Sequence, residues 1–185
     1  MSGEQFATAP AHTQRMAVSL KYAVIERERR FLVRSIPNAV TGVTRIVDRY
    51  IEGSRLRLRE VHGEGGQVVR KLGHKVRLGD GFSEIACTSI YLDDAEWRLL
   101  SQLPARVLHR HRHHVERDGV HVAIDQFADG TLLAEIDDGD RCPAPVPSWL
   151  EVIADVTADE LWTGGSLAAD KGELVAGDER ITNRS

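Results

Sequence analysis

The sequence lacks long apolar runs and contains few cysteines. Its longest apolar stretches are far shorter than the roughly 20 residues that a membrane-spanning helix needs, and its N-terminus has no continuous apolar core of a secretory signal. The two cysteines, Cys87 and Cys142, show neither paired metal spacing nor a disulfide framework. We therefore expect a cytoplasmic protein with free thiols and no membrane partner.

An excess of positive charge is also missing. The chain has 24 lysines and arginines against 28 aspartates and glutamates, which gives a formal charge of −4 and a pI of about 6.1. This balance argues against a protein that coats nucleic acid with a basic face, so we expect no stable nucleic-acid partner. Any anion site must be a local concentration of basic side chains.

The length and composition are those of one globular domain. The 185 residues are 42% apolar and 28% charged, which is enough to bury a core. Residues 1–19 mix small and polar types without a period and are expected to form a flexible leader. We assign residues 20–165 to the folded domain and residues 166–185 to a polar C-terminal tail.

Most of this domain has the pattern of short strands separated by Gly, Asp and Asn turns, which favours antiparallel β-structure. Eight such strands can close into a barrel. The predicted strands are 22–33, 44–52, 55–62, 67–77, 84–91, 106–117, 120–127 and 131–137.

Helical patterns are few. Asp93 is followed three residues later by Glu96, and apolar residues then recur at helical spacing, so a helix is predicted over 93–103. Shorter helices are expected around 149–154 and 158–162. The predicted fold class is therefore α+β but mainly β, with a few peripheral helices.

The polar faces of the predicted strands are unusually charged. Arg55, Arg57 and Arg59 alternate with leucines, and Glu135 and Asp137 alternate with apolar residues. Because successive side chains of a strand face opposite sides, this pattern suits either an open sheet with a solvated charged face or a closed barrel with a charged lumen. The mixture of both signs across strands favours a lumen that binds a metal and its anionic ligand together.

One strand carries a recognisable motif. Residues 26–30, Glu-Arg-Glu-Arg-Arg, resemble the Glu-x-Glu-x-Lys motif that opens CYTH domains, with Arg30 in place of the usual lysine. Further motifs follow in the order typical of this family, and the resemblance covers residues 21–165. They are Asp48-Arg49-Tyr50-Ile51, Arg57-Leu58-Arg59, the basic strand with Lys71, Thr88-Ser89-Ile90-Tyr91-Leu92, Arg110-His111-Arg112, Asp125 and Glu135-Ile136-Asp137.

The resemblance to the CYTH, or triphosphate tunnel metalloenzyme, superfamily implies an eight-stranded antiparallel tunnel-like barrel that binds polyphosphate and divalent metal. Activities in the family include inorganic, thiamine and RNA triphosphatases and a class of adenylate cyclase, so the fold does not identify the substrate. We expect metal-dependent hydrolysis of inorganic triphosphate or a triphosphate-bearing small molecule such as a nucleoside triphosphate or thiamine triphosphate. The alternatives are a nucleotide cyclase of the same fold and a noncatalytic polyphosphate or nucleotide sensor.

The acidic motifs supply the candidate metal ligands and catalytic residues. Glu26 and Glu28 lie two positions apart, so on a strand their carboxylates point to one side and can share a cation. Oxygen ligands suit Mg²⁺ or Mn²⁺. We expect Glu26 and Glu28 to be catalytic, and the metal ligands to be Glu26, Glu28, Asp125, Glu135 and Asp137.

The basic motifs supply the candidate phosphate ligands. Arginine offers a planar, permanently charged fork that suits phosphate oxygens. Arg55 and Lys75 fit the same faces but match the family pattern less securely. A guanidinium is a poor proton acceptor at neutral pH, so a mechanism that needs a neutral lysine at position 30 is not expected. The expected phosphate-binding residues are Arg30, Arg57, Arg59, Lys71, Arg110 and Arg112.

A histidine-rich run occupies residues 109–114. Its histidines at 109, 111 and 113 share one face of a strand and are too extended for one tetrahedral metal site. A surface or partly packed role is the main interpretation, and a pH-sensitive or metal-binding role is the alternative.

Overall fold

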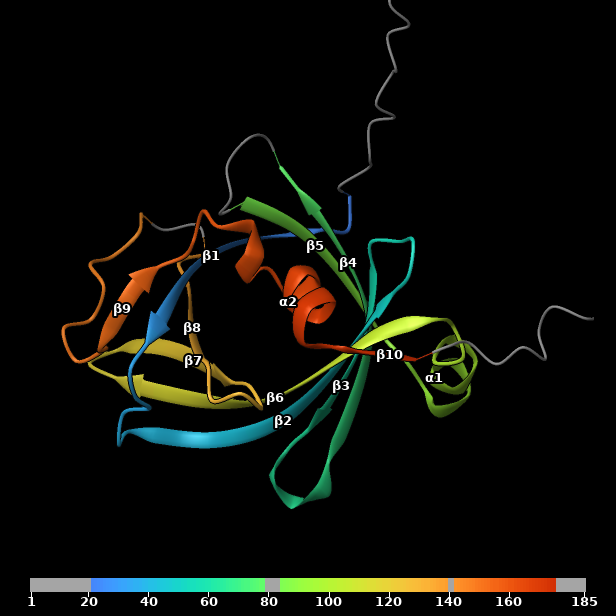
Figure 1. Cartoon of the computed structure of the whole chain (residues 1–185), viewed down its shortest axis with the longest axis horizontal. Coiled ribbons are helices and arrows are strands. Elements are labelled where there is room, and N and C mark those ends of the chain that lie inside the picture. The colour runs from blue at the N-terminus through green and yellow to red at the C-terminus, as the bar shows by residue number, and fades with distance from the viewer. Residues whose placement is uncertain (1–20, 79–83, 140–141, 176–185) are drawn as a thin grey trace, which may run out of the picture.

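Eight antiparallel strands form a closed barrel in the computed structural model, which describes residues 21–78, 84–139 and 142–175 (Figure 1). The leader expected over residues 1–19 lies outside the described residues. The barrel strands are β1 (Val24–Val33), β2 (Val40–Ile51), β3 (Leu56–His62), β4 (Val68–Arg77), β5 (Glu84–Tyr91), β6 (Ala105–Arg117), β7 (Val120–Gln126) and β8 (Leu132–Asp137).

The order of the strands around the barrel is β6-β2-β3-β4-β5-β1-β8-β7, and β7 pairs back onto β6 to close it. Two further strands continue edges that shorter partners leave open. β9 (Val152–Asp155) pairs with the end of β1 that β5 does not reach, and β10 (Glu173–Val175) pairs with the start of β6. All of these pairings are antiparallel.

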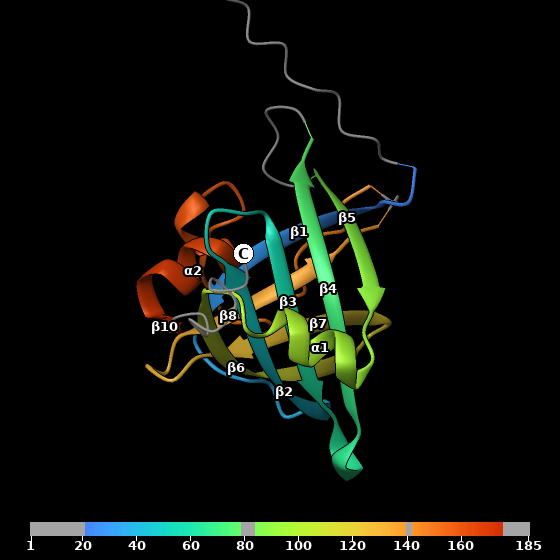
Figure 2. The ribbon, with the colours of Figure 1, turned by 90° about the vertical axis from the view of Figure 1, so that its right-hand side faces the viewer.

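The structure confirms the predicted eight-stranded antiparallel tunnel-like barrel. Each predicted strand overlaps one barrel strand, because the alternation of apolar and charged residues that defined it matches the two faces of a barrel wall. The predicted helix after β5 is α1 (Asp94–Leu100), and the Asp93 side chain accepts hydrogen bonds from the Ala95 and Glu96 amides at its start. Figure 2 shows α1 against the outside of the barrel.

Two expectations about the C-terminal part were wrong. The segment expected to be helical around 149–154 contains β9, because Val152 and Ile153 are β-branched and the open edge of β1 offers backbone partners. The expected polar tail starting at 166 is folded as far as 175: it contains most of α2 (Gly164–Lys171) and all of β10. The helix expected around 158–162 is present as the short 3-10 helix η2 (Glu160–Trp162).

Apolar clusters cover the outside of the barrel at two places. One packs Phe31, Val115 and Ile124 under the loop residue Leu150, and the other packs Leu58 under the α1 side of the molecule. These contacts bury the outward faces of the strands and leave the inward faces to the lumen. In the described part of the chain, no helix is long and apolar enough to cross a membrane.

The C-terminal helix α2 covers part of one end of the tunnel. Its Leu167 and Ala168 are buried against Leu108 of β6, Leu133 of β8 and Phe127, which follows β7. These three residues point inward, so α2 packs onto lumen-facing side chains, whereas α1 packs onto the outer wall. Figures 1 and 2 place the two helices on different sides of the barrel.

The lumen changes from apolar to charged over a single step of the strand period. Arg110, Asp125 and Glu135 lie two residues from Leu108, Phe127 and Leu133, respectively, and they also line the lumen. The apolar residues pack against α2, and the residue two positions away on each of these segments supplies a charged group to the lumen. The fold therefore places a charged cavity directly beside the packed helix.

We predict that Gly164→Ala destabilises the protein. A Cβ atom at Gly164 would lie 2.0 Å from the Tyr50 hydroxyl, so either the ring or α2 must move. We expect a loss of about 1–3 kcal/mol in the free energy of unfolding, measured by denaturant titration.

The matched control is Gly165→Ala in the same helical turn, where nothing lies within 4 Å of the added Cβ. This variant should keep or slightly raise stability, because alanine favours the helix. Equal effects of the two substitutions would contradict the proposed packing of Tyr50 on α2.

Candidate functional site

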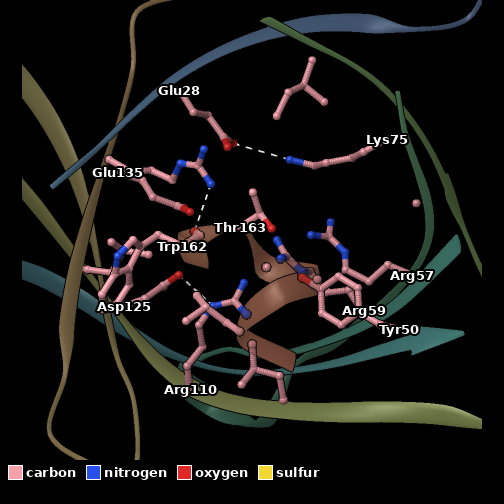
Figure 3. Close-up of a pocket in the computed structure, with 18 of the residues that line it drawn as sticks. Glu28, Tyr50, Arg57, Arg59, Lys75, Arg110, Asp125, Glu135, Trp162 and Thr163 are labelled. Carbon is pink, nitrogen blue, oxygen red and sulfur yellow. Dashed lines mark hydrogen bonds and ion pairs between the residues drawn. The ribbon is translucent and has the colours of Figure 1, made fainter. Parts of the chain in front are cut away.

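A cavity of about 340 Å³ lies inside the barrel beside α2 (Figure 3). Three acidic side chains line it, from Glu28, Asp125 and Glu135, and they are outnumbered by eight basic ones. Because the chain as a whole is acidic, an anion site needs a local excess of basic side chains, and the lumen provides one. The basic residues are Arg30, Arg55, Arg57, Arg59, Lys75, Arg77, Arg110 and Arg112.

A single buried carboxylate organises three of these arginines. Asp48 of β2 is fully buried, and its Oδ1 and Oδ2 accept hydrogen bonds of 2.7 and 2.9 Å from Nε and Nη2 of Arg59. Arg110 donates to Oδ2 at 2.7 Å, and Arg57 Nε lies 3.6 Å from Oδ1. Strand pairing places Asp48 directly opposite Arg59, which brings the two side chains to one face.

The charge on Asp48 is essential to this arrangement. Burial acts to raise the pKa of its carboxyl, but the guanidinium groups of Arg59, Arg110 and Arg57 hold that pKa far below its usual range. Asp48 is therefore ionised at any physiological pH. One carboxylate cannot neutralise three cations, so the cluster keeps a net positive charge facing the cavity.

A second ion-pair network joins β6, β7 and β8. Arg112 donates two hydrogen bonds of 2.7 Å to the carboxylate of Asp125 and also pairs with Glu135. Arg110 Nε lies 2.8 Å from Asp125 Oδ2, so this arginine connects the second network to Asp48. Burial acts to raise the pKa of Glu135, but Arg112 and Arg110 lower it to about 2. Glu135 is thus an ionised counter-ion of the arginines, and Asp125 pairs with the same two arginines.

The motif glutamates of β1 meet a lysine of β4, two strands away in the barrel wall. Lys75 Nζ of β4 lies 2.6 Å from Glu26 Oε2 and 3.6 Å from Glu28 Oε1. Figure 3 shows Lys75 and Glu28 reaching toward each other across the cavity. Glu26 and Glu28 therefore share the ammonium group of Lys75 in this structure, and their expected role as metal ligands stays a prediction.

Glu28 has the less favourable electrostatic environment of the two glutamates. Burial raises the pKa of its carboxyl, and the neighbouring Glu135 and Glu26 raise it further, while Lys75 and Arg112 act in the opposite direction. The neighbouring positive charges therefore do not fully stabilise the ionised form of Glu28. In contrast, the pKa of Glu26 is lowered, because Lys75 outweighs the effect of its burial.

Arg30, at the position of the family's lysine, holds the C-terminal segment. Its Nη1 donates to the Trp162 carbonyl at 2.9 Å and its Nη2 to the Thr157 carbonyl at 3.1 Å. The side chain is buried and lines the cavity, and its buried Nε has no hydrogen-bond partner among the described residues. Arg30 thus uses two of its five N–H groups on the C-terminal segment, and its expected role as a phosphate ligand stays a prediction.

Three other predicted site residues are not part of the cavity lining: Glu26, Asp137 and Lys71. The Asp137 side chain is exposed, and its Oδ1 accepts hydrogen bonds from the backbone amides of Arg27 and Gly139, so it stabilises a turn instead of joining Glu135. Lys71 faces the same side as Arg59 but lies away from the cavity lining, with Nζ 4.9 Å from the centre of the Tyr91 ring. The structure brings together the other predicted residues.

Sequence reasoning missed several residues of the site. Asp48 was part of a quoted motif but was not assigned a role, although its register opposite Arg59 follows from the hairpin between them. Tyr50, two residues along the same face, lines the cavity and packs on Gly164. The residues contributed by the C-terminal segment gave no sequence signal, because they reach the lumen through tertiary packing. They are Trp162, Thr163, Gly164, Gly165 and Leu167.

The donor set fits a divalent metal that is completed by a phosphate ligand. Among the described residues, no three carboxylate, imidazole or thiol side chains surround a common point. Mg²⁺ commonly binds one or two protein carboxylates together with phosphate oxygens and water. Glu26 and Glu28 meet that requirement, and the negative charge around Glu28 would be relieved by a cation. The histidines at 109–113 belong to no such group.

Comparison with known proteins gives distant structural likenesses. No protein-family model and no curated protein matches the sequence. The structure is similar to two crystal structures of NE1496, one described as a hypothetical protein and one as an inorganic triphosphatase. The identities are 20% and 21%, each covers 77% of this chain and 97% and 93% of the other, and both TM-scores are 0.48.

A third similar structure is the PH1012 protein of Pyrococcus horikoshii OT3. It is 16% identical over 60% of this chain and 77% of the other, with a TM-score of 0.45. At these levels of similarity no activity transfers to the present chain, and its own residues must carry any functional conclusion.

We predict that Asp48→Asn weakens both the fold and the arginine cluster. Removing the buried negative charge leaves three guanidinium groups facing each other, and we expect a loss of about 3–5 kcal/mol in the free energy of unfolding at pH 7. Because the pKa of Asp48 is lowered in the folded protein, its contribution is present above the unfolded value of about 3.9. The difference between variant and wild type should therefore shrink as pH falls below about 4.

Denaturant titrations at pH 7 and pH 3 measure this difference. Asp94→Asn is the control, because Asp94 also pairs with an arginine, Arg70, but its side chain is 84% exposed. That variant should change stability by less than about 1 kcal/mol. If Asp48→Asn is equally mild at pH 7, the carboxylate does not hold the cluster together.

Proposed function

We propose that this protein hydrolyses a phosphoanhydride bond of inorganic triphosphate, or of a triphosphate-bearing small molecule, with a divalent metal in the barrel lumen. The observation that carries the proposal is the convergence of eight basic side chains with Glu28 around one cavity, where Lys75 also connects Glu28 to Glu26. A compact chain of phosphates is the ligand class that needs many cations together with a carboxylate-bound metal.

The arginines are held in place and still have donors for phosphate oxygens. A guanidinium has five N–H groups. Arg59 uses Nε and Nη2 on Asp48, and Arg112 uses the same two atoms on Asp125 and Glu135, so Nη1 of each remains for a ligand. Because the carboxylates fix these side chains beforehand, little conformational entropy is lost when phosphate binds.

The carboxylates of β1 suit the chemical step. Glu26 and Glu28 would hold Mg²⁺ or Mn²⁺, which when bound neutralises phosphate oxygens and acidifies water. Glu28 lines the cavity, so its carboxylate would also be placed to accept a proton from an attacking water. Arg57, Arg59 and Arg110 would stabilise the charge that develops on the transferred and leaving phosphates. This mechanism forms no covalent enzyme intermediate.

The direct test is phosphate release from inorganic triphosphate, ATP and thiamine triphosphate, each with Mg²⁺, with Mn²⁺ and with EDTA. We expect metal-dependent release from at least one substrate. The double variant Glu26→Gln/Glu28→Gln should lower kcat/KM by about 10²-fold or more, because it removes both the metal ligands and the proton acceptor. Glu173→Gln on β10, away from the cavity, is the matched control and should retain activity.

Two other results would redirect the proposal. Cyclic nucleotide and pyrophosphate from ATP would identify a cyclase. Tight binding of triphosphate with no release under any metal condition would identify a sensor.

A further inference from the structure

Lys75 occupies the place between the two motif glutamates that a shared metal would need. Its ammonium lies 2.6 Å from Glu26 Oε2 and 3.6 Å from Glu28 Oε1. A cation that bridges these carboxylates must use the same oxygens. Lys75 and the metal therefore compete for one site.

Lys75 is also held differently from the arginines of the cavity. Arg59 and Arg112 each make two parallel hydrogen bonds to a carboxylate, which fixes the position of the guanidinium plane. Lys75 makes single contacts through one ammonium group at the end of a flexible four-carbon chain. That group can leave the glutamates by side-chain rotation alone, without movement of β4.

A phosphate chain in the cavity would offer the released ammonium a new partner. Lys75 lines the same cavity as Arg57. Burial acts to lower the pKa of its ammonium, Glu28 and Glu26 raise that pKa overall, and repulsion by the nearby Arg57 acts against the rise. An anion between these two cations would remove that repulsion. The Lys75 ammonium could therefore move from the glutamates to a bound phosphate without leaving the cavity.

We propose that Lys75 is an exchangeable counter-ion that couples metal binding to phosphate binding. Without metal, its ammonium neutralises Glu26 and Glu28 and is withheld from phosphate. When a divalent cation binds the glutamates, the ammonium is displaced and transfers to the phosphate chain. By linkage, each ligand then strengthens the binding of the other, and neither binds well alone. This inference rests on the proposed function, because it takes the glutamate pair as the metal site.

The first test measures Mn²⁺ binding in the absence of phosphate, from the electron paramagnetic resonance signal of free Mn²⁺ at pH 8. Lys75→Met should bind Mn²⁺ about tenfold more tightly than wild type, because the competing ammonium is gone. Lys75→Arg keeps the charge and should stay within about threefold of wild type. Arg55→Met removes a cavity charge that has no contact with the glutamates and should also change Mn²⁺ affinity little.

The second test measures tripolyphosphate binding in EDTA by isothermal titration calorimetry, so that no metal is present. In the wild-type background Lys75→Met should cost less than about threefold in affinity, because Lys75 is held by the glutamates. In the Glu26→Gln/Glu28→Gln background the ammonium is free, and the same substitution should cost about tenfold. Arg55→Met should have equal effects in both backgrounds.

The outcomes separate this inference from the function on which it rests. Suppose that Lys75→Met lowers the tripolyphosphate affinity equally in both backgrounds and does not tighten Mn²⁺ binding. Lys75 is then a fixed phosphate ligand or a structural counter-ion, and the proposal of an exchangeable counter-ion is wrong. If Glu26→Gln/Glu28→Gln leaves Mn²⁺ binding unchanged, the metal site itself is misplaced and the proposed function fails with it.

Discussion

The contact between Asp48 and three arginines is the constraint on which the rest of the site depends. Guanidinium groups repel one another, and a cavity crowded with them would open or fill with counter-ions without an internal anion. Asp48 is fully buried and pairs with Arg59 and Arg110, and Arg110 in turn reaches Asp125. The lumen is thereby stabilised as one connected network that still carries excess positive charge.

The barrel was predictable because its information is local. Strand patterns, turn residues and the capping pair at α1 each depend on neighbours in sequence, and the inward and outward faces follow from the period of two. The C-terminal segment was not predictable in this way. Residues 164–175 fold because Leu167 packs on apolar residues inside the barrel and β10 pairs with the free edge of β6. Both of these partners are distant in sequence.

The sequence was sufficient to predict which strands contribute charged side chains to the candidate site. Period and motif order placed Glu28, Arg57, Arg59 and Arg112 on one lumen, as observed. They could not distinguish a ligand from a counter-ion: Asp137 at the end of β8 bonds to backbone amides, which no spacing rule would indicate. That distinction depends on three-dimensional pairing across several strands.

The central claim is that the lumen binds a chain of phosphates together with a metal held by the β1 glutamates. The most direct measurement is a crystal structure with Mn²⁺ and a slowly hydrolysed triphosphate analogue, with anomalous scattering to locate the metal. We predict phosphates within hydrogen-bond distance of Arg57, Arg59 and Arg112, and manganese bound to Glu26 and Glu28. An empty lumen with phosphate on the outer surface, or manganese at a site away from β1, would contradict the account.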